Sequence, residues 1–463
     1  MTFNDFVLLA TDVQEVKEAG QKRITFNLRV PPSEFGETFN PVPAEYDARE
    51  MRLQLLELEA RALGWAGVIR LGAGLGEILL PPPVRELLLQ ALARVEAQEE
   101  SLRIRLVLEG PLHNVPWEYT LLNRGGGEAT PLDFLGLMPQ VSIVRHQAAT
   151  MPAWDLAAGT PARMVVGLAS PAGHAPLHLD QERQAIEAAL SDNPRIAATF
   201  VPKATSETLL QGTNQAHLFH FAGHGDFERG MGVQPGTTEG TGYLVLEDGY
   251  GDPQPVDAHQ VGLQLRRAGV RVAVLGACES GRRDDVNVWS SVAAAMLKAG
   301  LGAVVGMQYT VRDDCAIAFA GAFYRALVAG LPIDAAVTAG RIAVAQLDAR
   351  DWGVPVLYLR AKEGVVFSEY TADARLEEVR EEIVVRAQQR IEVLRGKAVA
   401  VEIGTMTQGR VESQQEIGTI AEGGEATGVK IGELGAGSVE AKQEADKVDK
   451  GGSVTGVKID QLG

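Results

Sequence analysis

The distribution of proline and aromatic residues divides this chain of 463 residues into two unlike parts. All 22 prolines and every Phe, Trp and Tyr lie before residue 371, so residues 371–463 contain neither kind. Without aromatic side chains, this segment cannot build a core as the preceding residues do. An array of short repeats is the usual alternative, because stacked copies bury one another's apolar residues.

A repeat with a 14-residue period runs through residues 397–463. Five copies share an apolar position, occupied by Ile403, Ile417, Ile431, Ala445 and Ile459, and the first four also share a glycine position, occupied by Gly409, Gly423, Gly437 and Gly451. Two alternate copies, TGVKIGEL and TGVKIDQL, are nearly identical, so the unit is either 14 or 28 residues long. Alternating Val and Ile bounded by glycine is typical of strands joined by turns, and we predict a β-type repeat. A disordered glycine-rich tail is the alternative.

The residues just before this repeat have a different pattern. Residues 371–396 carry apolar side chains three and four positions apart, which places them on one stripe of a helix. We therefore predict an amphipathic helix over residues 371–396, packing on the main domain or on another chain.

Residues 1–362 have the alternating pattern of an α/β protein. Apolar runs with strand character alternate with helical patterns in the second half of this region: 163–170, 216–225, 242–249, 270–278, 302–308 and 354–360. Such runs favour a mostly parallel sheet covered by helices. We predict a smaller N-terminal α/β half, 1–155, and a second half, 156–362. Residues 72–77, GAGLGE, lack one glycine of the dinucleotide-binding motif, and we interpret them as a turn.

Charge and cysteine content exclude several classes of protein. The net charge of −17 argues against nucleic acid or an anionic membrane as the main partner, although solubility alone explains it. Cys278 and Cys315 are the only cysteines, which excludes a disulfide framework and a cysteine-rich zinc site. The N-terminus does not resemble a signal peptide, and no apolar run of roughly 18 residues predicts a membrane-spanning helix. We expect a cytoplasmic protein without membrane insertion.

The residues with the clearest chemistry stand at the ends of two predicted strands. HLFHFAGHG ends near His224, and VAVLGACESG ends near Cys278. Carboxyl ends of parallel strands share one edge of a sheet, so imidazole and thiol are expected to meet there, where the base promotes thiolate formation. The backbone N–H groups of Gly225 and Cys278 are candidates for an oxyanion hole. A lone cysteine is more often a small buried hydrophobe, but a histidine about 50 residues upstream matches the layout of caspases.

Several segments carry a resemblance to a known family. HFAGHG, GYLVLEDG, LGACESG and LKAGLGAVVGMQYTVRD resemble the CHAT domain, a prokaryote-rich branch of the caspase-like cysteine peptidases. VPWEYTLL and VSIVRH are similar to its N-terminal half, so the resemblance covers roughly residues 1–362. It implies a caspase-like sandwich and an endopeptidase with Cys278 as nucleophile, His224 as general base and acid, and no metal or organic cofactor. It also implies a triggered effector of bacterial defence or programmed cell death.

Four acidic residues near the strand ends are candidates for a substrate pocket. Asp226 and Glu279 follow the two motif residues, and Asp313 and Asp314 begin a predicted helix. Such carboxylates select a basic P1 side chain, the residue on the amino side of the cleaved bond, but solvated loop acids have the same sequence.

The remaining histidines and the second cysteine favour structural roles. His217 and His220 point to opposite faces of a strand, which argues against a metal site shared with His224. His220 is expected in the core, and Cys315 is expected to be a buried thiol in a helix over 312–329.

Two functional hypotheses follow. The first is a cysteine endopeptidase that cleaves a partner protein and is regulated through its repeats, by a sensor or adaptor carrying similar repeats or by self-assembly through residues 397–463. The second is a non-catalytic CHAT-like scaffold that assembles through the tail. The first predicts that Cys278→Ala abolishes function, whereas the second predicts that only deletion of the tail does.

Overall fold

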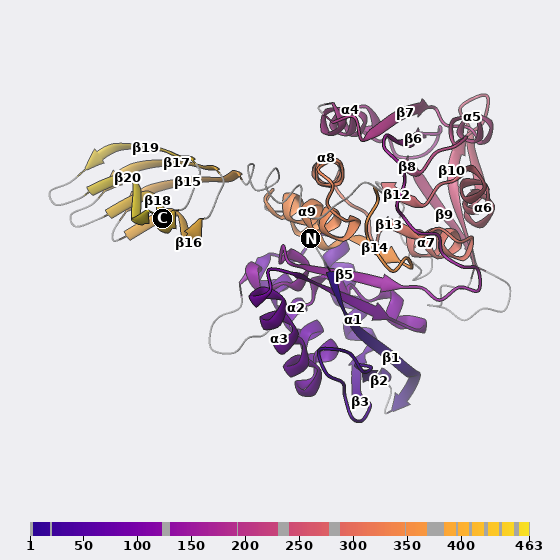
Figure 1. The fold of residues 1–463 in the computed structure, drawn as a ribbon, viewed down its shortest axis with the longest axis horizontal. Helices are drawn as coiled ribbons and strands as arrows, with labels where there is room; N and C mark the ends of the chain where they lie inside the picture. Colours follow the sequence, from indigo (N-terminus) through magenta and orange to yellow (C-terminus); the bar gives the residue numbers. More distant parts are fainter. Residues whose placement is uncertain are drawn as a thin grey trace. The chain divides into compact units, whose positions relative to one another are not determined.

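The computed structural model divides the chain into two compact units, Met1–Tyr370 and Thr371–Gly463, and each is described by itself (Figure 1). The structure describes residues 3–18, 21–122, 130–191, 193–229, 240–276, 288–347 and 349–367 of the first unit. In the second unit it describes the six strands given below.

The N-terminal part of the first unit supplies five strands and three helices. These are β1 (Phe3–Glu18), β2 (Gln21–Arg29), β3 (Val42–Asp47), α1 (Ala48–Glu59), α2 (Trp65–Leu79), α3 (Pro82–Ala97), β4 (Ser101–Val107) and β5 (Val141–His146). Local chemistry explains the helix starts, because the Asp47 carboxylate accepts from two backbone N–H groups of α1 and prolines occupy the first turn of α3.

The C-terminal part of the first unit mixes strands and helices. Its elements are β6 (Ala162–Leu168), α4 (Leu179–Leu190), β7 (Ile196–Pro202), α5 (Ser206–Gly212), β8 (Leu218–Ala222), β9 (His224–Arg229), β10 (Gly240–Glu247), β11 (Pro253–Asp257), α6 (Ala258–Ala268), β12 (Val272–Gly276), α7 (Val288–Lys298), β13 (Ala303–Met307), α8 (Asp313–Val328), α9 (Ile333–Ala345) and β14 (Pro355–Leu359). Four strands follow in succession from β8 to β11, and two helices follow in succession, α8 and α9.

One sheet of eleven strands runs through both parts, in the order β3-β2-β1-β4-β5-β14-β13-β12-β8-β6-β7. The pairs from β1 to β14 and from β13 to β7 are parallel, and only β13/β14 and the two pairs of the β1–β3 edge are antiparallel. This mixed, mostly parallel sheet flanked by helices confirms the predicted α/β class. The predicted 155/156 boundary between halves falls between β5 and β6, within this continuous sheet.

The 242–249 run does not join the main sheet as its apolar character suggested. It forms β10, which pairs antiparallel with β9 and β11 in a separate small sheet. The reason lies next to it in the sequence, since β9 begins at His224 directly after β8 and leads the chain away from the main sheet.

Both faces of the strands near the candidate site are buried. Phe219 and Phe221 of β8 belong to a hydrophobic cluster with α6 and α7, whereas Leu218 and Ala222 belong to a larger cluster that includes α4, α8 and α9. Alternate residues of one strand thus pack against opposite helical layers, which explains why the strand is a continuous apolar run.

Residues 72–77 are helical, so their interpretation as a turn is wrong. They lie within α2, and the glycines serve close packing: a Cβ on Gly72 would lie 2.7 Å from Tyr119 O, and one on Gly76 would lie 2.3 Å from Leu121 O. The backbone N–H of Leu121 donates to Gly72 O at 3.0 Å. Glycine here lets a helix touch backbone directly, a use that the sequence pattern does not distinguish from a turn.

The second unit is a β-solenoid of two parallel sheets. Its strands are β15 (Val384–Leu394), β16 (Lys397–Met406), β17 (Arg410–Ile420), β18 (Glu425–Leu434), β19 (Ser438–Val448) and β20 (Ser453–Leu462). β15-β17-β19 form one sheet and β16-β18-β20 the other. Ile403 pairs with Ile431 and Ile431 with Ile459, so one coil spans 28 residues and contributes a strand to each sheet. The five predicted copies correspond to β16–β20.

The helix predicted over 371–396 is wrong in its second part, where Val384–Leu394 is strand β15. Residues 371–383 lie outside the described part of the chain. Spacing of three and four fits residues 384–394, but so does strand alternation. Pairing decides between them: Val385 lies in register with Val411, and Ile391 with Ile417. Partner strands thus override the local helical pattern.

Candidate functional site

His224 lies at the carboxyl edge of the main sheet, just after β8. Its side chain is 2% exposed, and the ring stacks near that of His174, with 4.7 Å between centroids. Its Nε2 lies 3.0 Å from the backbone oxygen of Ala175, in the loop before α4. A carbonyl only accepts, so Nε2 carries a hydrogen in this contact. In the neutral ring, Nδ1 is then the nitrogen that acts as the base.

The neighbouring strand β12 ends beside β8. The two strands are parallel, with Ala222 in register with Gly276, and the Gly223 N–H donates to Gly276 O at 3.4 Å. Cys278 and Glu279 lie outside the described residues. Gly225 is described and follows His224 in β9, in register with Leu244.

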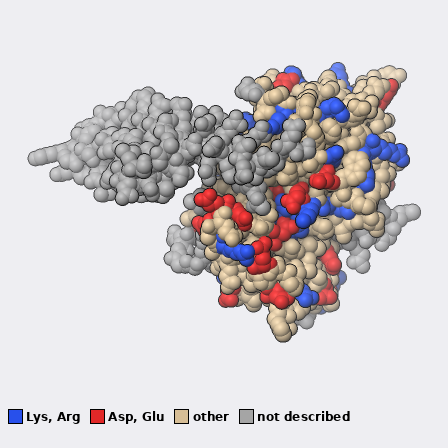
Figure 2. Space-filling model, viewed as in Figure 1, with Lys and Arg blue, Asp and Glu red and all other residues tan. Residues whose placement is uncertain are grey.

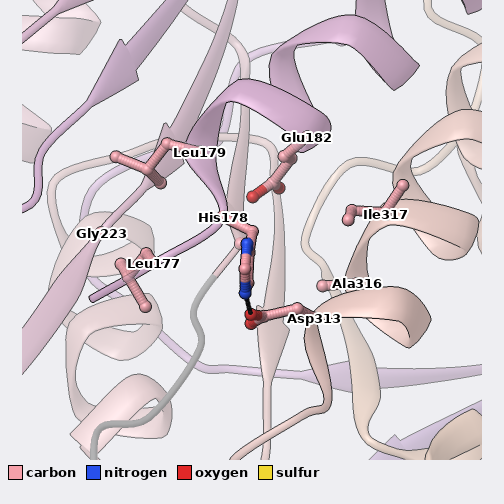
Figure 3. A pocket seen from close by; sticks show the side chains of 9 residues that line it. Leu177, His178, Leu179, Glu182, Gly223, Asp313, Ala316 and Ile317 are labelled. Carbon is pink, nitrogen blue, oxygen red and sulfur yellow. Dashed lines mark ion pairs between the residues drawn. The ribbon is translucent and has the colours of Figure 1, made fainter. Parts of the chain in front are cut away.

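A narrow cavity, with room for little more than a water molecule, lies at these two strand ends. Gly223 and Gly276 line it at the strand ends, and Figure 3 shows the start of α4 with its preceding loop on one side and the first turn of α8 on the other. It is lined by Leu177, His178, Leu179, Glu182, Gly223, Gly276, Asp313, Ala316 and Ile317. Gly276, in its lining, is the last described residue before Cys278.

Asp313 is the predicted pocket acid that reaches this cavity. Figure 3 shows its carboxylate facing the His178 ring, with 3.3 Å between Asp313 Oδ2 and His178 Nε2. The same two residues also line a wider open cleft beside α8, together with Asp314. Because both residues line both spaces, the cavity and the cleft meet at the Asp313 carboxylate and the His178 imidazole.

The other predicted pocket acids lie differently. Asp314 lines only the wider cleft and forms an ion pair with Arg312, whose hydrogen bonds hold the Asp314 pKa below its usual range and keep it ionised. Asp226 lies on β9 and accepts from the Phe227 N–H at 2.8 Å, and it does not line the cavity. Among the three predicted acids that the structure describes, Asp313 is the one that lines both the cavity and the cleft.

A buried polar triad lies behind the cavity. His220 Nδ1 is 2.9 Å from the hydroxyl of Tyr324 on α8, and its Nε2 is 3.1 Å from Glu182 Oε1 on α4. Glu182 also lies close to Gly276, where a Cβ would come within 2.6 Å of Oε1. The core position predicted for His220 is confirmed. Glu182 and Tyr324 had no local sequence signal, because their partner is far away in the chain.

The three histidines of HxxHxxxH have separate partners. His217 Nδ1 accepts from the Arg163 N–H at 3.0 Å, whereas His220 and His224 bond as described above. The opposite orientation predicted for His217 and His220 agrees with these contacts.

Cys315 lies in α8 and is buried, as predicted. Burial raises the pKa of its thiol to about 12, and the Asp351 and Asp314 charges act in the same direction. A raised pKa leaves almost no thiolate at pH 8, so we expect iodoacetamide to leave Cys315 unmodified in the folded chain and to alkylate it after denaturation. Peptide mapping by mass spectrometry measures this. Modification in the folded chain at the rate of a free cysteine would contradict the assignment.

Comparison with known proteins identifies the family. A model of the CHAT domain matches residues 70–399. This chain belongs to the CHAT domain family. The match confirms the resemblance carried by the sequence motifs and places both His224 and Cys278 inside the CHAT domain, which extends beyond residue 362. The family is a branch of the caspase-like peptidases, and the sheet of the first unit is the fold expected for it.

The solved structures that match this CHAT domain protein are distant. Two crystal structures of the Saccharomyces cerevisiae separase–securin complex are each 14% identical to it, with TM-scores of 0.31 and 0.30. The matches cover 59% and 67% of this chain and 17% and 22% of the separase chains, so the chain spans less than a quarter of their length. A comparison with curated proteins found no match.

Surface charge and helix character are two further features of the described part of this CHAT domain protein. On the face in Figure 2, Lys and Arg are interspersed with Asp and Glu. Among the described helices, none combines the length and the apolar character that crossing a membrane requires.

Proposed function

We propose that this CHAT domain protein is a cysteine endopeptidase with a Cys278–His224 dyad. The observation that carries the proposal is the pairing of β8 with β12: His224 follows one strand, and the other leads into Cys278 after Gly276. The bond from His224 Nε2 to Ala175 O supports it, because it leaves Nδ1 as the base. No metal or organic cofactor enters the proposed chemistry.

In each half-reaction of the proposed mechanism, His224 first accepts a proton and then returns it. His224 takes the thiol proton, and the Cys278 sulfur attacks the peptide carbonyl, while the N–H groups of Gly225 and Cys278 receive the oxyanion. His224 then protonates the leaving amine as the C–N bond breaks, which leaves a thioester. Water, deprotonated by His224, attacks the thioester and releases the carboxylate and the thiol.

A basic P1 side chain is the substrate feature that the open cleft beside α8 favours. Asp313 lines this cleft, partly exposed beside a well-exposed His178, whereas Glu182 is buried against His220. A lysine or arginine side chain would take the place of His178 beside the Asp313 carboxylate, and opposite charge supplies selectivity. Glu279, Asp226 and Asp314 remain proposed contributors to the same pocket.

Asp313→Asn is expected to reduce kcat/KM for a basic-P1 peptide by about tenfold or more, because the substrate cation loses its counter-charge. A neutral-P1 peptide serves as the internal reference and should change little. Asp180→Asn is the matched control, since its carboxylate is nine-tenths exposed on α4. Equal losses for basic and neutral peptides would contradict a selective role.

The C-terminal repeats are proposed to regulate this peptidase. A sensor or adaptor with similar repeats, or another copy of this chain, would bring catalytic units together or release them from inhibition. Such control suits a triggered effector of bacterial defence or programmed cell death that cleaves a partner protein in the cytoplasm.

The test of the proposed function is peptide-bond cleavage by wild type compared with Cys278→Ala after forced dimerisation. The scaffold alternative, assembly through the tail without catalysis, predicts that both behave alike and that only removal of the repeats matters. The His224 geometry favours the enzyme, since a scaffold has no requirement for a fixed imidazole tautomer.

A further inference from the structure

The first and last coils of the solenoid carry opposite charges at equivalent positions. The first coil consists of β15 and β16, and the last consists of β19 and β20. In the described part of the chain, these four strands are the outer strands of the two sheets. An outer strand offers unpaired backbone N–H and C=O groups along its free side, so it accepts a further strand.

The charged residues in register between neighbouring coils differ between the two contacts within one chain, from first to second coil and from second to last. Between the first and second coils, the registered pairs of charged residues are opposite: Arg386 with Glu412, Arg390 with Glu416, Lys397 with Glu425, and Glu402 with Lys430. Between the second and last coils, they are alike: Glu412 with Glu440, Glu416 with Glu444, and Lys430 with Lys458. Like charges directly opposite one another destabilise a strand pair. The last coil therefore presents charges that its own neighbour does not complement.

We propose that a second copy of this chain stacks its first coil onto the last coil of this one. Continuing the same parallel register opposes the charges at three positions: Arg386 to Glu440, Arg390 to Glu444, and Glu402 to Lys458. The continued register also sets Glu392 opposite Asp446, so three opposite pairs stand against one like pair. The charges of the first coil thus complement those of the last coil at these three positions.

Apolar residues keep their positions across this contact. Continuing the register places Val385 at Val439 and Ile403 at Ile459, as between the coils within one chain. Parallel stacking of the same coil therefore preserves both the apolar positions and the strand direction of the existing sheets.

The contact is head-to-tail, with different surfaces on the two copies. A contact of this kind leaves a free first coil at one end and a free last coil at the other, so it forms open chains of copies. This inference rests on the assembly role proposed for the repeats but not on peptidase activity.

The test measures the mass of the full chain against concentration by sedimentation. Wild type should self-associate, and Glu440→Arg/Glu444→Arg should weaken the association constant by about tenfold or more. Within one chain this change places arginines opposite Glu412 and Glu416, so it improves the stack, and loss of assembly cannot be assigned to unfolding. Lys442→Glu is the matched control on the same strand, because its counterpart, Gln388, is uncharged, and it should assemble as wild type does.

A mixing experiment tests the direction of stacking. The Glu440→Arg/Glu444→Arg chain keeps an intact first coil, so added to wild type it should join a free last coil and stop further growth, which lowers the mean mass. A wild-type chain that stays monomeric, a double variant that assembles as wild type does, or a mixture that leaves wild-type assemblies unchanged would overturn the proposal. Since mass is measured and not cleavage, failure here and failure of the peptidase proposal are separate results.

Discussion

Cys278→Ala is expected to abolish peptide-bond cleavage, with a loss in kcat of about four orders of magnitude or more. The alanine has no atom that can form the thioester, so only uncatalysed hydrolysis remains. His224→Ala should cost about as much, and the double variant little more, because nucleophile and base act as one unit. Single-turnover cleavage of a basic-P1 peptide library, with the chain dimerised through a fused pair of helices, measures all three.

The second cysteine supplies the matched control for this experiment. Cys315→Ala removes the only other thiol, which is buried in α8, and should leave cleavage within a few-fold of wild type if the variant folds. Wild type and Cys278→Ala cleaving every peptide at the same rate would refute the enzyme. Additive losses in the double variant would instead refute a dyad.

Glu118→Ala is expected to lower the free energy of unfolding by about 3–5 kcal/mol, because it leaves the buried Arg145 guanidinium without its carboxylate. Arg145 Nη2 donates to Glu118 at 2.6 Å and Nε at 3.0 Å, and both side chains are fully buried. Gln308, just after β13, donates to the same carboxylate at 2.8 Å. Burial alone would lower the pKa of Arg145, but the Glu118 charge and hydrogen bond together with Tyr358 and Tyr309 outweigh it, so the net pKa is raised and the cation persists.

Urea unfolding followed by circular dichroism measures this loss. Glu118→Gln keeps the size of the side chain and removes its charge, so a similar cost identifies the unpaired guanidinium as the cause rather than a cavity. Glu109→Ala, at an exposed position nearby, is the control and should change stability little. Unfolding of Glu118→Gln at the wild-type urea concentration would contradict the argument. Replacing both partners with apolar residues should cost less than either single change.

The secondary structure of the first unit was largely predictable because its strands are buried on both faces. Continuous apolar runs such as 270–278 and 302–308 can hardly form anything else between helices. The order of strands was not predictable, since insertion of β14 between β5 and β13 depends on contacts between distant segments. For residues 384–394, local spacing fitted a helix, and only pairing with β17 decided for a strand.

The sequence could identify site residues that act through a distinctive side chain. It could not identify residues that act through a backbone atom. His224 could be found because its glycine-flanked strand is distinctive. Ala175 could not, because it contributes a backbone oxygen that any residue would provide. Glu182 and Tyr324 are ordinary helical residues in sequence, and their meeting at His220 follows only from the packing of α4 and α8 on β8.

The continuous sheet also limits how this chain can be divided. Cutting at residue 155 would separate β5 from β14, uncovering two strands that are buried on both faces and still have hydrogen-bonding groups to satisfy. Recombination in evolution, or a fragment made for the laboratory, can exchange the repeats beyond residue 370 as a module. The two halves before it are inherited together, because the pairing of β5 with β14 covers an edge strand of each half.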